Sequence, residues 1–130
     1  TMRLGALPCH VKKESQAYKA YKSDEVMERH RHRYEFNNEY REDFNKNGFK
    51  IVGTSPGGKL VELIELEDHP WFVASQYHPE FKSKPDKAHP LFREFIRHSM
   101  QYADKMGLSV EKNGEVPAVE EREVLLEKVD

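Results

Sequence analysis

The sequence predicts an α/β domain with a mixed sheet and a C-terminal helix. Residues 49–77 hold three apolar runs separated by turns, which is typical of an antiparallel meander. Residues 90–106 repeat apolar side chains at helical spacing. With 130 residues, of which 37% are hydrophobic and 34% charged, the chain fits one domain with a core of its own.

The first part of the chain predicts short elements. Residues 3–11 alternate weakly and favour a short or irregular strand. Residues 17–21 alternate aromatic and polar side chains, which favours a second short strand. We expect one helical turn over residues 23–28, capped by Ser23 or Asp24.

The next segment, residues 29–36, alternates strictly and predicts a strand. On a strand, His30 and His32 lie on one face, because alternate residues project to the same side. The basic residues on the opposite face are then Arg29, Arg31 and Arg33. A short helix over residues 39–46 follows, ended by Gly48.

The meander is built from a hairpin and a third strand. Residues 49–53 and 60–66 flank the turn 55–58, and residues 71–77 form the strand that brings His78 to an edge of the sheet.

The C-terminal helix spans residues 90–106 and is expected to pack on one face of the sheet. Pro90 lies in its first turn and Gly107 just past its end. The aromatic residues assigned to the core are Tyr18, Tyr21, Trp71, Phe72, Phe92 and Phe95. Residues 1–107 form the domain, and residues 108–130, with 3 basic against 7 acidic residues, predict an acidic flexible tail.

Composition excludes several classes of function. No run approaches the roughly 18 apolar residues of a membrane helix, and the N-terminus lacks a signal-peptide layout. The single cysteine, Cys9, is consistent with a reducing compartment, so we expect a cytoplasmic protein. A net charge of −2 does not favour nucleic-acid binding.

The stretch 76–81 carries the clearest chemistry. His78 and Glu80 lie side by side if the preceding strand continues to them. A carboxylate beside an imidazole fixes its tautomer and stabilises its charged form, as a general base requires. A metal-binding or interaction domain using His30, His32 and His78 is the alternative.

Several motifs occur in the order of one known family, over residues 1 to about 104. They are TMRLGA (1–6), ERHRHRYEFNN (28–38), GTSP (53–56), DHPWFV (68–73), QYHPEF (76–81) and HPLFR (89–93). Together they resemble the C-terminal part of the class I glutamine amidotransferase domain of the CTP synthase family. The resemblance implies the C-terminal portion of a three-layer glutaminase-like domain.

The same resemblance implies a role for each site residue. His78 is the base and Glu80 its orienter in a Cys-His-Glu triad, and Arg33 holds the α-carboxylate of glutamine. It implies no metal in this site. Ammonia released from glutamine would aminate UTP to CTP in a synthase domain of a homo-oligomer that uses ATP and Mg²⁺, with GTP as activator.

The family's nucleophile pattern, Gly-x-Cys-x-Gly-x-Gln, is absent from this sequence. Cys9 has no small flanking residues and no predicted elbow, so we interpret it as a small core side chain. We therefore expect a CTP synthase fragment that is inactive alone, or one half of a two-chain enzyme.

Overall fold

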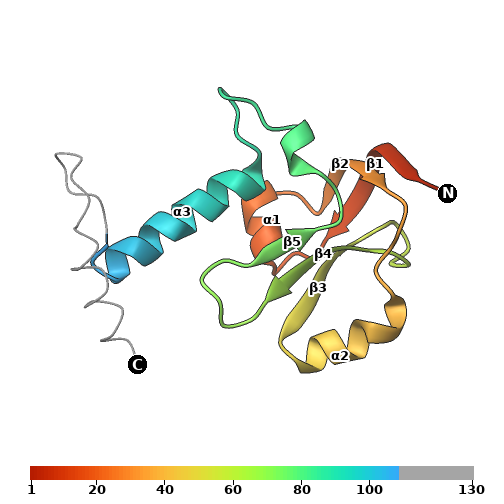
Figure 1. Cartoon of the computed structure of the whole chain (residues 1–130), viewed down its shortest axis with the longest axis horizontal. Helices are drawn as coiled ribbons and strands as arrows, with labels where there is room; N and C mark the ends of the chain where they lie inside the picture. Colours follow the sequence, from red (N-terminus) through yellow and green to blue (C-terminus); the bar gives the residue numbers. More distant parts are fainter. Residues whose placement is uncertain (109–130) are drawn as a thin grey trace.

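The computed structural model describes residues 1–108 of the chain. They contain five strands and five helical segments, and three of the strands follow one another directly in the sequence (Figure 1). The strands are β1 (Arg3–Val11), β2 (Glu25–His32), β3 (Phe49–Thr54), β4 (Val61–Leu66) and β5 (Val73–Ser75). The α-helices are α1 (Gln16–Tyr21), α2 (Arg41–Lys46) and α3 (Pro90–Lys105), and the 3-10 helices are η1 (Asn38–Tyr40) and η2 (Pro79–Phe81).

The strands form one sheet in the order β2-β1-β3-β4-β5, and in residues 1–108 every neighbouring pair is antiparallel. β1 pairs with β2 along nearly its whole length, but with β3 only at His10↔Thr54 and Val11↔Gly53. The predicted α/β class, with its meander and C-terminal helix, is confirmed. The described residues contain no parallel pair.

The core lies between the sheet and α1. Its buried members are Cys9, Val11, Ala17, Ala20, Val52, Leu63, Trp71, Tyr77 and Leu91. The Glu65 carboxylate on β4 accepts hydrogen bonds from the backbone amides of Gln16 (3.1 Å) and Ala17 (2.7 Å). These amides have no partner within the helix, so a buried carboxylate at the start of α1 satisfies them and fixes the helix against the sheet.

Two predictions for the first part of the chain are wrong. Residues 17–21 belong to a helix, because Ser15 caps it by accepting from the Tyr18 amide (2.9 Å) and because Ala17 and Ala20 bury the same face. The single helical turn expected over residues 23–28 is absent; Ser23 forms a local turn, and β2 begins at Glu25.

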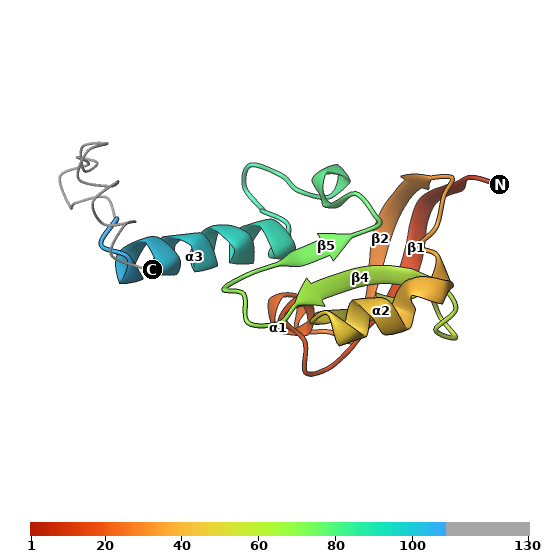
Figure 2. The same cartoon turned by 60° about the horizontal axis from the view of Figure 1, so that its bottom comes forward.

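Helix α3 has the predicted extent but not the predicted packing. His89 caps it by accepting from the Leu91 amide, with Pro90 in the first turn. Leu91 is its buried residue, whereas Phe92 and Phe95 are 40% and 52% exposed, so their assignment to the core is wrong. Both views show why: the helix meets α1 at its first turns and then extends away from the sheet (Figures 1 and 2).

The helices of residues 1–108 are too short or too polar to cross a membrane. The acidic tail predicted for residues 108–130 lies, from residue 109 onward, outside the described residues.

Candidate active site

The His78 and Glu80 side chains are in direct contact, with 2.5 Å between Nδ1 and Oε1. The strand expected to carry them ends at Ser75, and the contact is made by the 3-10 turn η2, where Pro79 occupies the first position. A proline there costs no hydrogen bond, and its fixed φ suits the turn. The predicted pairing is therefore present, but a turn produces it instead of a strand.

The carboxylate of the pair stays ionised. Partial desolvation acts to raise the pKa of Glu80, but hydrogen bonds from its own backbone amide and from His78 outweigh it and lower the pKa below its ordinary value. An ionised Glu80 accepts the Nδ1 proton of His78. The Nε2 lone pair is then the one available for taking a proton from another group.

The pair is anchored to the opposite end of the sheet. The His78 amide donates to the Arg29 carbonyl on β2 (2.9 Å), and the imidazole stacks on Phe81 at a centroid distance of 5.0 Å. β2 is the edge strand farthest from β5 in the strand order. The segment after β5 therefore crosses to β2, and the pair lies at this junction.

Arg33 lies close to the same junction. It follows directly after β2, it is exposed, and the Gln76 side chain holds the next carbonyl, that of Tyr34, at 3.1 Å. Arg33 lies four positions after Arg29, the partner of His78, and a fully extended chain would place the two residues about 13 Å apart.

The two faces of β2 agree with the predicted alternation. His30 is buried and His32 half-buried, whereas Arg29 and Arg31 are exposed. The strand predicted over residues 29–36 is wrong in its extent, because β2 ends at His32 and the exposed Arg33 lies beyond it.

Cys9 is not placed to act as a nucleophile. The residue is fully buried, and burial, followed by the negative charges of Glu62 and Glu28, raises the pKa of its thiol to about 12. Its sequence neighbour His10 points to the other face, where it contacts Glu25 at 3.0 Å. The interpretation of Cys9 as a core side chain is confirmed.

Two of the three histidines considered for metal binding do come together. The His30 Nδ1 and His32 Nε2 atoms are 2.9 Å apart. The third group whose atoms lie within 4.8 Å of them is Glu62, not His78. The Arg3 guanidinium already pairs with Glu62, and His32 Nδ1 contacts the Tyr34 carbonyl at 3.0 Å. Arg3 thus supplies positive charge to this cluster, whereas His30 Nε2 and Glu62 Oε2 have no hydrogen-bond partner among the described residues.

A group of buried polar residues beside the site escaped the sequence interpretation. It consists of Tyr21, Glu28, Tyr77 and His89, joined by hydrogen bonds. Glu28 lies two residues before His30, on the same face of β2 as His30 and His32. This spacing was the available signal that its carboxylate faces inward.

Comparisons with known proteins identify the family. The model of the class-I glutamine amidotransferases matches residues 1–98. The chain is 61% identical over 107 residues to the CTP synthase of Desulfotalea psychrophila and 57% identical over 105 residues to that of Bacillus velezensis. These matches cover 82% and 81% of the chain but only 19% and 20% of the relatives, so the chain spans about one fifth of their length.

A solved structure agrees with the sequence relatives. The Trypanosoma brucei CTPS glutaminase domain with bound acivicin superposes with a TM-score of 0.72 at 39% identity, over 78% of this chain and 40% of that one. These relatives favour the glutaminase interpretation over a stand-alone metal-binding domain. The chain belongs to the class I glutamine amidotransferase family and corresponds to part of the glutaminase domain of CTP synthases.

Proposed function

We propose that this chain supplies the base half of a Cys-His-Glu glutaminase site, with His78 as the base and Glu80 as its orienter. The 2.5 Å contact between His78 Nδ1 and Glu80 Oε1 carries the proposal, because it leaves Nε2 available as the proton acceptor. His78 takes the thiol proton from a cysteine, and the thiolate attacks the amide carbon of glutamine. The imidazolium then protonates the leaving nitrogen, the C–N bond breaks, and ammonia departs.

Arg33 is the proposed contact for the substrate carboxylate. A planar guanidinium binds a carboxylate through two parallel hydrogen bonds, which orients the substrate as well as attracting it. The related glutaminase domain holds acivicin, a glutamine analogue, which supports L-glutamine as the substrate class. The position of Arg33 beside the junction of β2 and the His78 segment fits this role.

The nucleophile is proposed to come from a part of the glutaminase domain that this sequence does not contain. A thiol with a pKa of about 12 is almost wholly protonated near neutral pH, and Cys9 is also shut off from solvent. Water completes the reaction by hydrolysing the thioester to glutamate. We propose that the ammonia goes on to aminate UTP to CTP in a cytoplasmic homo-oligomer that uses ATP and Mg²⁺, with GTP as activator.

A complementation assay tests the proposal. The purified chain is mixed with the segment of the Desulfotalea psychrophila glutaminase domain that it does not match, and ammonia release from glutamine is measured. We expect no turnover from the chain alone and turnover from the mixture. His78→Ala abolishes it, Arg33→Lys raises KM for glutamine, and Cys9→Ala serves as the control that leaves it unchanged.

Two results would overturn the proposal. One is turnover by the chain alone that survives Cys9→Ala, since it would require another nucleophile. The other is turnover of the mixture that is unaffected by His78→Ala.

A further inference from the structure

Glu28 is a carboxylate with no solvent contact at the centre of a hydrogen-bond network. Its side chain is 0% exposed, and two hydrogen-bond donors and one ammonium group, which itself donates to the Met27 carbonyl, surround its Oε1 atom. Tyr21 donates from 2.8 Å, the His89 ring nitrogen Nε2 lies at 2.7 Å, and the Lys82 ammonium lies at 3.6 Å. A buried carboxylate is costly unless partners satisfy it, and all of these contacts fall on Oε1, whereas Oε2 has no hydrogen-bond partner among the described residues.

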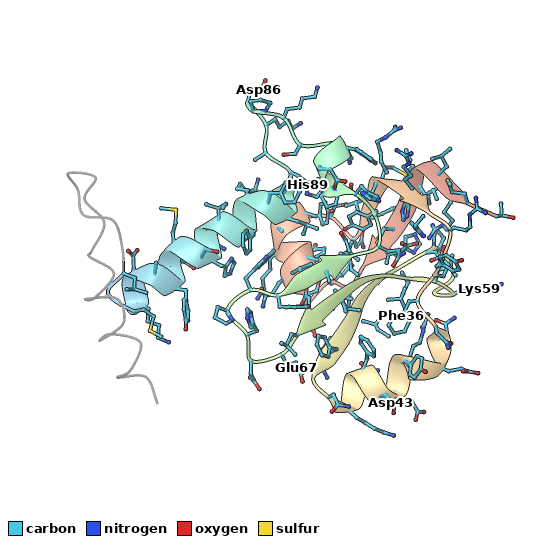
Figure 3. All side chains as sticks on the ribbon, viewed as in Figure 1. Phe36, Asp43, Lys59, Glu67, Asp86 and His89 are labelled. Carbon is cyan, nitrogen blue, oxygen red and sulfur yellow. The ribbon has the colours of Figure 1, made fainter. Side chains whose placement is uncertain are left out.

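The hydrogen bonds of the network all point toward this carboxylate. His89 Nδ1 accepts from the Leu91 amide at the start of α3, so the ring proton lies on Nε2 and is donated to Glu28. Tyr21 uses its proton on Glu28, and the Tyr77 hydroxyl, 2.9 Å away, therefore donates to Tyr21. Figure 3 labels His89 where α3 begins, beside the turn of η2.

The network holds both ends of the segment that carries the candidate base. Tyr77 immediately precedes His78, and Lys82 immediately follows the turn that ends at Phe81. The residue after Glu28 on β2 is Arg29, whose carbonyl accepts the His78 amide at 2.9 Å. His78 is thus connected to Glu28 through the preceding Tyr77, through Lys82 after the turn, and through its own backbone amide on Arg29.

We propose that Glu28 is a positioning residue for the base: through Tyr21, Tyr77 and Lys82 it keeps His78 and Glu80 in register with β2. The inference rests on the proposed function for its catalytic meaning, but the positioning itself is a property of this chain. Without the carboxylate, the Tyr21 hydroxyl that contacts Tyr77 loses its acceptor, and Lys82 keeps only its hydrogen bond to the Met27 carbonyl. The imidazole then samples orientations in which Glu80 no longer fixes its tautomer.

Nuclear magnetic resonance of the full chain tests the positioning without any turnover. The readouts are hydrogen-exchange protection of the His78 amide, relative to amides in the middle of β1, and the imidazole ¹⁵N shifts of His78. Glu28→Gln keeps the shape of the side chain and removes its charge. Glu65→Gln is the matched control, because Glu65 is also a buried carboxylate but serves α1.

In Glu28→Gln we expect the protection of the His78 amide, relative to the β1 amides, to fall at least tenfold. We also expect the imidazole ¹⁵N shifts of His78 to move toward the values of a mixture of tautomers. Glu65→Gln should change the hydrogen-exchange protection of the His78 amide and of the β1 amides by the same factor, and it should leave the imidazole ¹⁵N shifts of His78 unchanged. A folded Glu28→Gln chain with unchanged relative protection would overturn the proposal. If this variant does not fold, Tyr77→Phe and Tyr21→Phe replace it, and unchanged His78 protection in both overturns it equally.

The complementation mixture gives a separate functional arm. There, Glu28→Gln should lower kcat about tenfold while KM for glutamine stays within twofold, because Arg33 is not connected to this network. A raised KM with unchanged kcat would contradict a role in positioning the base. Absence of turnover from the unaltered mixture would count against the proposed function, whereas the resonance measurements would still decide the role of Glu28.

Discussion

Acidification is expected to destabilise this fold through His30, a histidine only 1% exposed. Burial, assisted by the positive charges of Arg3 and then His32, lowers the pKa of His30 from 6.5 to about 4. The folded state therefore holds this imidazole neutral, whereas the unfolded chain protonates it near its ordinary pKa. The resulting stability is fully present above about pH 6.5 and is lost as the pH falls toward 4.

The size of the effect follows from the two pKa values. With 6.5 for the unfolded chain and about 4 for the fold, lowering the pH from about 7.5 to about 5 removes about 2 kcal/mol of the free energy of unfolding. Glu62 acts in the opposite direction. Burial, partly offset by Arg3, raises the pKa of its carboxyl, so that protonating Glu62 at low pH recovers stability.

Comparison with a variant separates the two groups. Urea unfolding can be followed by the fluorescence of Trp71, the single tryptophan, which lies in the core. In His30→Gln, the loss of stability between about pH 7.5 and about pH 5 should be smaller than in the unaltered chain by about 2 kcal/mol. Equal losses in the two proteins, or a His30 resonance that titrates near 6.5 in the folded chain, would refute the reasoning.

Three further predictions concern the core. Alkylation of Cys9 by iodoacetamide at about pH 8 should be roughly a thousandfold slower in the folded chain than in urea, because burial raises the pKa of the thiol to about 12. Equal rates in the two states would contradict the burial of Cys9. Gly53→Ala should lower the free energy of unfolding by about 1 to 3 kcal/mol, since a Cβ there would lie 2.7 Å from the Leu63 Cβ. Gly57→Ala is the comparison variant: a Cβ there meets open space but the φ is left-handed, so its cost measures backbone strain without crowding. Glu65→Ala should cost about 2 kcal/mol in urea unfolding by leaving two amides of α1 unpaired, and a change near zero would show that water replaces it.

The sequence predicted the elements whose formation depends on the pattern of nearby residues. The meander and α3 follow from the alternation and spacing of apolar residues, and both are present. Helix α1 was missed because five residues of aromatic and polar alternation outweighed the Ser15 cap. Its other support, the Glu65 carboxylate, lies 48 residues from Ala17 in the sequence. A pattern within a short window carries no information about such a partner.

The same distinction divides the candidate site. The contact of His78 with Glu80 spans two residues, so the sequence was sufficient to predict it. Its anchoring was not predictable, since Glu28 and His89 are 61 residues apart and a buried glutamate runs against ordinary expectation. Exposure of Phe95 was also missed, because helical periodicity identifies an apolar face without saying whether this chain covers it.

The contacts that organise the His78–Glu80 pair all lie within this chain. The imidazole and carboxylate are joined within one turn, and that turn is tied to β2 by backbone and buried side-chain hydrogen bonds. None of these contacts involves a nucleophile, so residues 1–108 organise the His78–Glu80 pair without one. Under the proposed function, a cysteine from another segment would meet an imidazole whose tautomer is already set, and no reorganisation of the base would be needed when the thiol loses its proton.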